Sequence, residues 1–242
     1  MASKDFMVIA HRGASSYAPE NTFAAFDLAI EMGARHIELD VHATADHQVV
    51  VIHDDTVDRT TNGTGPVTAH TLAELTALDA GAWFDARFSG ERIPRLSAVF
   101  QRYRGRVHVH VEIKGRSDDL AERTADLVRR HGMTTSVTIT SFQHARLDET
   151  RAYAPELPTG WLVPEVDDAV IARARAMRVT QICPKATGVT PALVERLHAE
   201  GFVVRAWGVA TEALMRQGVE AGADGMTVNF PDKLIAYLAT AR

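Results

Sequence analysis

Short runs of β-branched and other apolar residues alternate with amphipathic helical segments along most of this chain. Eight of these runs are predicted to be strands, at residues 7–10, 36–41, 107–113, 137–142, 159–163, 180–184, 202–207 and 225–228. Strands that alternate with helices pair in parallel through right-handed crossovers, and eight of them close into a barrel of about 250 residues. The chain has 242 residues. The alternation therefore predicts one α/β domain over residues 1–242, a TIM-type (β/α)8 barrel.

The connection after the second predicted strand breaks this alternation. Only residues 42–48 separate HIELDV from the next apolar run, VVVIHD at 49–54, whereas a parallel crossover needs about a dozen residues. We therefore predict an antiparallel β-hairpin, and a turn centred on Asp46 and His47 would place Asp40 opposite His53. Residues 55–105 lack the barrel alternation, and a long irregular segment of this kind is typical of a lid. They are predicted to be a small insertion that caps the barrel mouth.

Composition excludes several classes of protein. Hydrophobic residues make up 46% and charged residues 24% of the chain, as in ordinary globular proteins. The single cysteine, Cys183, allows no internal disulfide. The first residues lack the apolar length of a secretory leader, and no run approaches the ~18 apolar residues of a membrane span. We expect a cytoplasmic protein without stable membrane insertion. Its net charge of −5, without a basic block, argues against a nucleic-acid partner. Nothing in the sequence indicates an oligomeric state.

Acidic residues gather at two predicted strand ends. Glu38 and Asp40 are two apart and share one face of their strand, as do Glu112 and Lys114, while the alternate positions are apolar. The polar faces therefore point into the barrel, at the end where barrel active sites lie. Three inward carboxylates would repel one another unless a cation lies between them. Glu38, Asp40 and Glu112 together suit one divalent cation, Mg²⁺ or Ca²⁺, and the nearby histidines leave zinc as a less favoured alternative.

Two histidines flank the predicted metal site, His11 at the end of the first strand and His53 on the hairpin. Such a pair suits proton transfer around a metal-bound phosphate, where one histidine activates the nucleophile and the other protonates the leaving alkoxide. Arg12 is suited to bidentate binding of phosphate oxygens, and Lys114 to binding them as a point charge. These residues predict a phosphate ester as the substrate.

Several motifs together resemble the glycerophosphodiester phosphodiesterase family, within the superfamily of phospholipase C-like phosphodiesterases. They are, in chain order, HRG at 11–13, PENT at 19–22, Glu38-x-Asp40, His53-Asp54, DRTTNGTG at 58–65, GERIPRL at 90–96 and Glu112-x-Lys114. The resemblance implies a barrel, a divalent cation, and hydrolysis of small-molecule glycerophosphodiesters to glycerol 3-phosphate and an alcohol. The same histidines, carboxylates and phosphate-binding residues match the family's site, and Trp207 matches its tryptophan after the seventh parallel strand.

The last third of the chain departs from the family pattern. AWGVA stands where the family usually reads AWTVN, and TVNFPD where it reads ITDFPD, so that Asn229 replaces an acid. The lost negative charge is expected to alter which alcohol group is accepted.

Other interpretations of these residues remain open. The three carboxylates could pair with Arg35, Arg12 and Lys114, Trp207 could pack in the core, and Asn21 is expected to cap the following helix. A lysophospholipase D would be favoured by an apolar groove of Trp83, Phe84, Phe88 and Trp207. A non-catalytic barrel that binds a phosphate ester is a third possibility, but binding alone has no need of both histidines.

Overall fold

The structure is a computed structural model, and it describes residues 6–240. Eight parallel strands form a barrel that closes where β1 pairs with both β2 and β9. They are β1 (Met7–His11), β2 (His36–Ala43), β4 (His108–Ile113), β5 (Val137–Ser141), β6 (Thr159–Val163), β7 (Gln181–Pro184), β8 (Val203–Val209) and β9 (Gly225–Val228). The predicted TIM-type barrel is confirmed. Residues 1–5 and 241–242 of the predicted domain lie outside the described residues. Residues 1–5 belong to the N-terminal segment whose apolar run is too short for a secretory leader.

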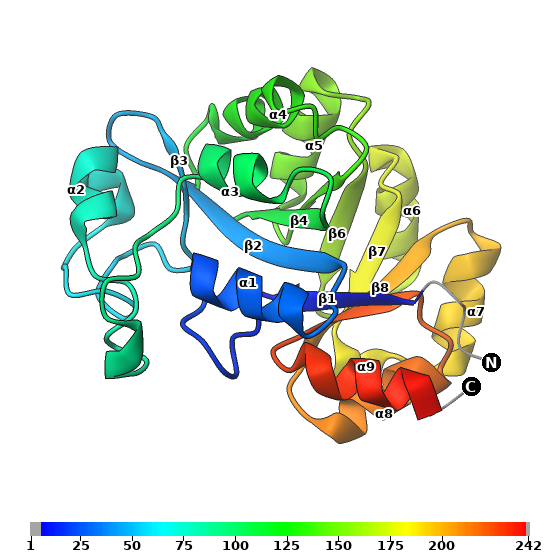
Figure 1. Cartoon of the computed structure of the whole chain (residues 1–242). Coiled ribbons are helices and arrows are strands. Elements are labelled where there is room, and N and C mark those ends of the chain that lie inside the picture. Colours follow the sequence, from blue (N-terminus) through cyan, green and yellow to red (C-terminus); the bar gives the residue numbers. More distant parts are fainter. Residues whose placement is uncertain (1–5, 241–242) are drawn as a thin grey trace.

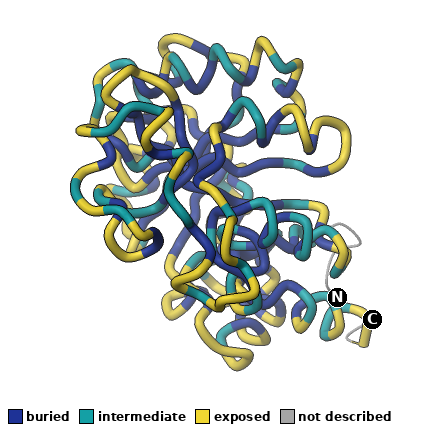
Figure 2. The backbone as a smooth tube through the Cα atoms, turned by 60° about the vertical axis from the view of Figure 1, so that its left-hand side comes forward, coloured by how far each residue is buried: buried dark blue, intermediate teal, exposed yellow. Residues whose placement is uncertain are grey.

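Helices follow the strands and surround the barrel (Figure 1). They are α1 (Phe23–Glu31), α3 (Leu96–Tyr103), α4 (Leu120–Arg130), α5 (His144–Tyr153), α6 (Asp168–Met177), α7 (Pro191–Ala199), α8 (Glu212–Glu220) and α9 (Pro231–Thr240). Buried backbone is concentrated at the centre, and the outer surfaces of the helices are exposed (Figure 2). Among residues 6–240, no helix has both the length and the apolar content to cross a membrane.

The two faces of β2 and β4 differ in chemistry. The odd-numbered residues of both strands are buried aliphatic side chains in the core that also includes helix residues such as Phe26 and Phe100. The even-numbered residues are polar and point into the barrel, because successive side chains of a strand alternate between its faces. This alternation fixes the position of the site, since it places a row of carboxylates and imidazoles inside the barrel.

The predicted hairpin is present, but its register is shifted by one residue. Strand β3 (Val49–Val51) pairs antiparallel with β2, with Val51 opposite Val41, and the Ile52 amide donates to the Asp40 carbonyl. Asp40 thus lies opposite Ile52, and the predicted pairing with His53 is wrong. The cause is a three-residue loop, closed between Thr44 and Gln48, in which His47 adopts a left-handed conformation with φ 57°.

The predicted insertion is present as a segment that stands beside β3, apart from the helical layer (Figure 1). It contains α2 (Leu72–Ala77) and the 3₁₀ turns η1 (Val67–Ala69) and η2 (Ala86–Phe88). A small apolar cluster of its own, with Val57, Leu75 and Ile93, joins it to Val50 and Ile52 of the hairpin. Helix α3 lies inside the predicted range 55–105, yet its apolar residues belong to the barrel core. The barrel layer therefore resumes at Leu96, because α3 is the helix of the crossover from β2 to β4.

A layer of three histidines fills the barrel interior below the carboxylates. His36 Nδ1 lies 3.2 Å from His110 Nε2, and His108 Nε2 lies 2.9 Å from Thr138 Oγ1. Burial lowers the pKa of His36 to about 4. Burial, together with the charge of Arg205, lowers the pKa of His110 well below its usual value. These three histidines therefore form a polar layer deeper in the barrel than the carboxylates. They are neutral near pH 7.

This histidine layer predicts acid lability. The unfolded chain binds protons at histidine near pH 6.5, whereas the folded chain binds them at His110 only at much lower pH, so stability falls as the pH drops below 6.5. For His110 alone, a loss of unfolding free energy is expected between pH 7.5 and 4.5, because the unfolded chain gains a proton there that the folded chain does not bind. Urea unfolding in EDTA should show this difference between the wild type and His110→Asn, with exposed His144→Asn as the control. An unchanged pH dependence in His110→Asn would contradict it.

Candidate active site

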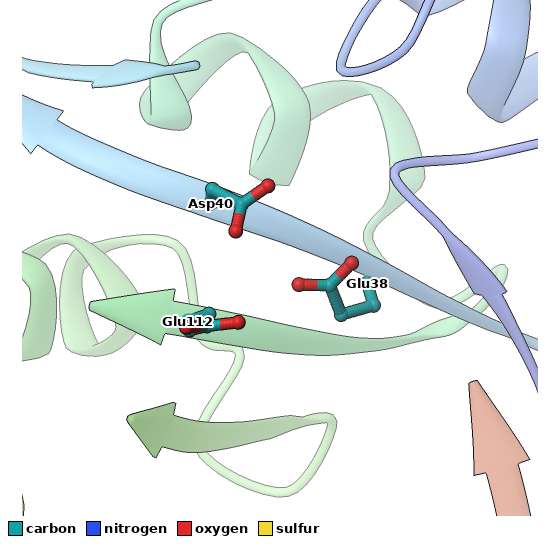
Figure 3. A group of neighbouring side chains, drawn as sticks. All are labelled: Glu38, Asp40 and Glu112. Atoms are coloured by element: carbon teal, nitrogen blue, oxygen red, sulfur yellow. The ribbon is translucent and has the colours of Figure 1, made fainter. Parts of the chain in front are cut away.

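Three carboxylates meet at the barrel mouth. Glu38 and Asp40 come from β2 and Glu112 comes from β4, and one oxygen of each lies within 4.8 Å of the others. The strand pairing explains this cluster, because Asp40 lies beside Glu112 and His11 lies beside Glu38. Figure 3 shows the three side chains converging from the two neighbouring strands. All three are buried, so charge accumulates here with little solvent to screen it.

The cluster fits a cation with oxygen ligands. Glu38 Oε1 and Asp40 Oδ1 are buried without a hydrogen-bond partner. Burial and the charge of Asp40 raise the pKa values of both Glu38 and Glu112. Unpartnered carboxylate oxygens and mutual repulsion are both relieved when a divalent cation binds between the groups, and hard cations prefer oxygen ligands. Glu38, Asp40 and Glu112 therefore form a set of donors suited to one such ion.

Two positive side chains border the carboxylates. Arg12 Nε lies 3.1 Å from Asp40 Oδ2, and Arg12 Nη1 donates to Glu20 at 2.8 Å. Lys114 Nζ lies 2.9 Å from Glu112 Oε1 and 3.8 Å from Asp40 Oδ1. The carboxylates thus form ion pairs with Arg12 and Lys114, as the alternative interpretation of these residues expects. Arg12 and Lys114 line the same cavity as the two histidines. Their ion pairs with the carboxylates therefore also hold the two positive side chains beside this cavity.

A strained turn carries His11 and Arg12 to the mouth of the barrel. Arg12 has φ 55° and Gly13 has φ 84°, both in the left-handed region. A Cβ on residue 13 would lie 2.5 Å from the Ala25 carbonyl carbon. The HRG sequence therefore needs glycine at its third position for the turn to pack against α1. The same turn directs the Arg12 amide to Glu38 Oε2 at 3.1 Å.

The two histidines have different electrostatic partners. His11 Nδ1 donates to the amide oxygen of Asn229 at 2.6 Å, whereas His53 Nδ1 donates to the carboxylate of Asp54 at 2.6 Å. Partial burial and the charge of Arg12 lower the pKa of His11 to about 4. The amide oxygen of Asn229 carries no full charge, whereas the Asp54 carboxylate carries a full negative charge. In both rings Nε2 remains available for proton transfer.

Two adjoining cavities contain the site. The first, of about 220 Å³, is lined by both histidines, both cations, Glu38 and Glu112, with an apolar wall of Phe142, Leu162 and Trp207. The second, of about 430 Å³, shares His53, Glu112, Lys114 and Phe142 with the first and extends to Asp55 and Arg116. The Trp207 ring meets Phe142 edge to face, with 4.8 Å between centroids, and its Nε1 donates to the Val163 carbonyl. A ligand held across both cavities would pass over the residues that they share, His53, Glu112, Lys114 and Phe142.

Residues 11–233 match the sequence profile of the Glycerophosphoryl diester phosphodiesterase family. The chain belongs to this family. It is 39% identical to a glycerophosphodiester phosphodiesterase from Caldanaerobacter subterraneus, over 95% of this chain and 96% of the relative. The predicted family membership is thus confirmed.

Solved structures of the family have the same fold. A glycerophosphodiester phosphodiesterase from Agrobacterium tumefaciens matches with a TM-score of 0.84 and 36% identity, over 94% of this chain and 98% of the other. An Oleispira antarctica phosphodiesterase, solved in complex with the product sn-glycerol-3-phosphate, matches with a TM-score of 0.87 and 28% identity, over 96% of both chains.

Asn21 has a different position from the one that the sequence suggested. Its side chain donates to Asp40 Oδ2 at 2.9 Å, and the residue has φ 58°. The expected helix cap is supplied by Thr22, whose hydroxyl accepts from the Ala25 amide. The prediction that Asn21 caps the helix is therefore wrong. The reason is that the turn after HRG directs its side chain inward to the carboxylate cluster.

Other residues around the site were not identified from the sequence. Phe142 follows β5 and forms part of the apolar wall, and Arg205 on β8 lies beneath the carboxylates, fully buried, with Nη1 donating to Thr227. The signal available for Arg205 was its position on β8, and for Phe142 its position directly after β5. Asn229, whose uncharged side chain is expected to alter which alcohol group is accepted, contacts His11.

The aromatic residues of the insertion do not form the expected groove. Trp83, Phe84 and Phe88 pack against one another. Among the described residues that line the two cavities of the site, the aromatic rings are those of Phe142 and Trp207, besides the histidines. The apolar groove that would favour a lysophospholipase D is therefore not formed by those residues.

Proposed function

We propose that this protein hydrolyses glycerophosphodiesters to glycerol 3-phosphate and an alcohol, with one divalent cation, Mg²⁺ or Ca²⁺, held by Glu38, Asp40 and Glu112. The observation that carries the proposal is a cavity in which two histidines with different partners flank a buried carboxylate cluster. Membership of the glycerophosphoryl diester phosphodiesterase family supports it. So do relatives named for this activity and the product-bound structure from Oleispira antarctica.

The charged residues have separate roles in binding. When bound, the cation polarises the phosphoryl group and offsets charge that develops in the transition state. Arg12 and Lys114 bind phosphate oxygens from the cavity wall, and both stay protonated because neighbouring carboxylates raise their pKa values against the opposing effect of burial. Permanent positive charge beside the phosphate stabilises the extra negative charge of the transition state.

The histidines divide the proton transfers. His11 is neutral at pH 7, because its pKa is about 4, and it accepts the proton of the nucleophile at Nε2. His53 is the general acid, since the hydrogen bond from its Nδ1 to the Asp54 carboxylate orients the ring and leaves Nε2 to give a proton to the leaving alkoxide. The nucleophile is water or the neighbouring glycerol hydroxyl, and the second route passes through a cyclic phosphate.

The two cavities accommodate the two halves of the diester. The smaller cavity, with Trp207 and Phe142, suits the short carbon skeleton of the glycerol. The larger and more polar cavity, with Asp55 and Arg116, suits the variable alcohol. Trp207 acts through contact with the substrate, so Trp207→Ala is expected to raise KM.

Isotope labelling tests the proposed reaction. Glycerophosphocholine incubated with the enzyme and its cation in H₂¹⁸O should give glycerol 3-phosphate labelled in the phosphate, together with unlabelled choline. Label in choline, or phosphocholine as the product, would contradict it. A cyclic phosphate seen by ³¹P NMR would identify the glycerol hydroxyl as the nucleophile.

The setting of the enzyme is part of the proposal. It acts in the cytoplasm, in the turnover of lipid-derived glycerophosphodiesters, and residues 1–242 work as one domain with the insertion at the barrel mouth. The single cysteine, which is buried, supports a reducing compartment.

A further inference from the structure

Arg59 lies outside the two cavities, yet its guanidinium forms four hydrogen bonds to two carboxylates. Nε and Nη2 donate to the two oxygens of Asp54, at 2.7 and 3.0 Å. Nη1 and Nη2 donate to the two oxygens of Glu20, at 2.9 and 2.8 Å. Two edges of one planar group thus each form a bidentate pair. A lysine ammonium cannot reproduce this geometry, because it has no second edge.

Both carboxylates that Arg59 holds also contact residues of the site. Asp54 Oδ1 accepts from His53 Nδ1 at 2.6 Å, and Glu20 Oε1 accepts from Arg12 Nη1 at 2.8 Å. A continuous chain of hydrogen bonds therefore runs from the proposed general acid to the phosphate-binding arginine, through one residue of the insertion. Hydrogen bonds from Arg59 also hold the pKa of Asp54 well below its usual range.

We propose that Arg59 is a positioning residue, which couples the orientation of His53 to that of Arg12 and makes the insertion part of the catalytic machinery. Arg59 fixes the Asp54 carboxylate, so that the His53 ring keeps its proton on Nδ1 and one orientation. It also satisfies Glu20, so that Arg12 retains donors for the phosphate. Partners of this kind, one contact removed from the chemistry, contribute about 10–100-fold to activity.

The inference rests on the proposed roles of His53 and Arg12, and it adds a requirement of its own. The two functions of Arg59 predict that loss of its side chain affects kcat through His53 and KM through Arg12. Metal affinity should be unchanged, because neither Asp54 nor Glu20 belongs to the carboxylate cluster.

Arg129 provides a matched control. Its guanidinium also forms a bidentate pair, with Glu156, at 2.8 and 3.3 Å, on the outer surface of the barrel. Arg59→Ala is expected to lower kcat by about 10–100-fold and raise KM, whereas Arg129→Ala should leave both unchanged. Arg59→Lys should recover little activity, and added guanidinium ions should restore part of the activity of Arg59→Ala.

A double-mutant cycle distinguishes positioning from a general loss of structure. Once Asp54→Asn has been introduced, Arg59→Ala should cost much less in kcat than it does in the wild type, because both changes break one chain of contacts. The downfield Nδ1 proton resonance of His53 should disappear in Asp54→Asn and weaken in Arg59→Ala. This signal requires no turnover, so it tests the inference even if the wild type fails to release glycerol 3-phosphate.

Each result is decisive. Equal kcat in Arg59→Ala and the wild type, or additive losses in the cycle together with an unchanged His53 resonance, would overturn the inference while the proposed function stands. If Arg59→Ala does not fold, Arg59→Lys is used in the cycle and the NMR experiment, with the same criteria.

Discussion

Replacing Glu38 with Gln is expected to lower kcat by roughly 10³-fold, which corresponds to about 4 kcal/mol of transition-state stabilisation. The same change should raise the free energy of unfolding of the metal-free protein at pH 7.5. Burial and neighbouring carboxylates raise the pKa of Glu38, so its stabilising protonated form is lost as the pH rises through that value. Removing the charge removes this penalty, and it also removes one of the three proposed metal ligands.

Thermal unfolding in EDTA and in Mg²⁺ or Ca²⁺ measures both effects. The wild type should have a lower Tm in EDTA than with the cation, whereas Glu38→Gln should have a higher Tm than the wild type in EDTA and a reduced response to the cation. Glu195→Gln, at an exposed position on α7, serves as the control. A Tm of Glu38→Gln below that of the wild type in EDTA, with full response to the cation, would argue against a metal site at these carboxylates.

Alanine at His11 or at His53 is expected to lower kcat by about 10²–10⁴-fold without changing the affinity for the cation. The two variants should differ in their dependence on the leaving group. A p-nitrophenyl ester of glycerol 3-phosphate needs no proton on its leaving group, so His53→Ala should recover much of its activity on this substrate. His11→Ala should not, because the nucleophile still needs a base. Steady-state kinetics on both substrates, with exposed His198→Ala as the control, measure this difference.

Recovery of activity on the p-nitrophenyl ester by His11→Ala, and not by His53→Ala, would make His11 the general acid and His53 the general base. Equal losses on both substrates for both histidine variants would argue against division of the proton transfers between them. Cation binding measured by calorimetry in each variant keeps this outcome separate from damage to the carboxylate cluster.

The barrel and the carboxylate cluster could be predicted because each depends on a short-range pattern. Alternation with a period of two determines the inward face of a strand, and parallel strands bring their carboxyl ends to one edge. Glu38, Asp40 and Glu112 therefore meet once the strands pair. The same alternation could not place Glu20, Asp54 and Asp55, because these three carboxylates lie in loops.

The register of the hairpin and the contacts of the loops depend on geometry that the sequence pattern does not contain. One residue in a left-handed conformation, His47, moves His53 from its predicted partner. Arg59 reaches Glu20 across 39 positions of sequence, and His11 reaches Asn229 across 218. Such contacts arise from the way in which loops fold over the barrel mouth, so the motifs that contain these residues could be recognised before their roles could be assigned.

Release of glycerol 3-phosphate from glycerophosphocholine tests the central claim most directly. The purified protein should release it with Mg²⁺ or Ca²⁺, lose this activity in EDTA, and regain it when the cation is restored. Release that continues undiminished in EDTA, or no release with either cation, would contradict the account of a metal-dependent glycerophosphodiester phosphodiesterase.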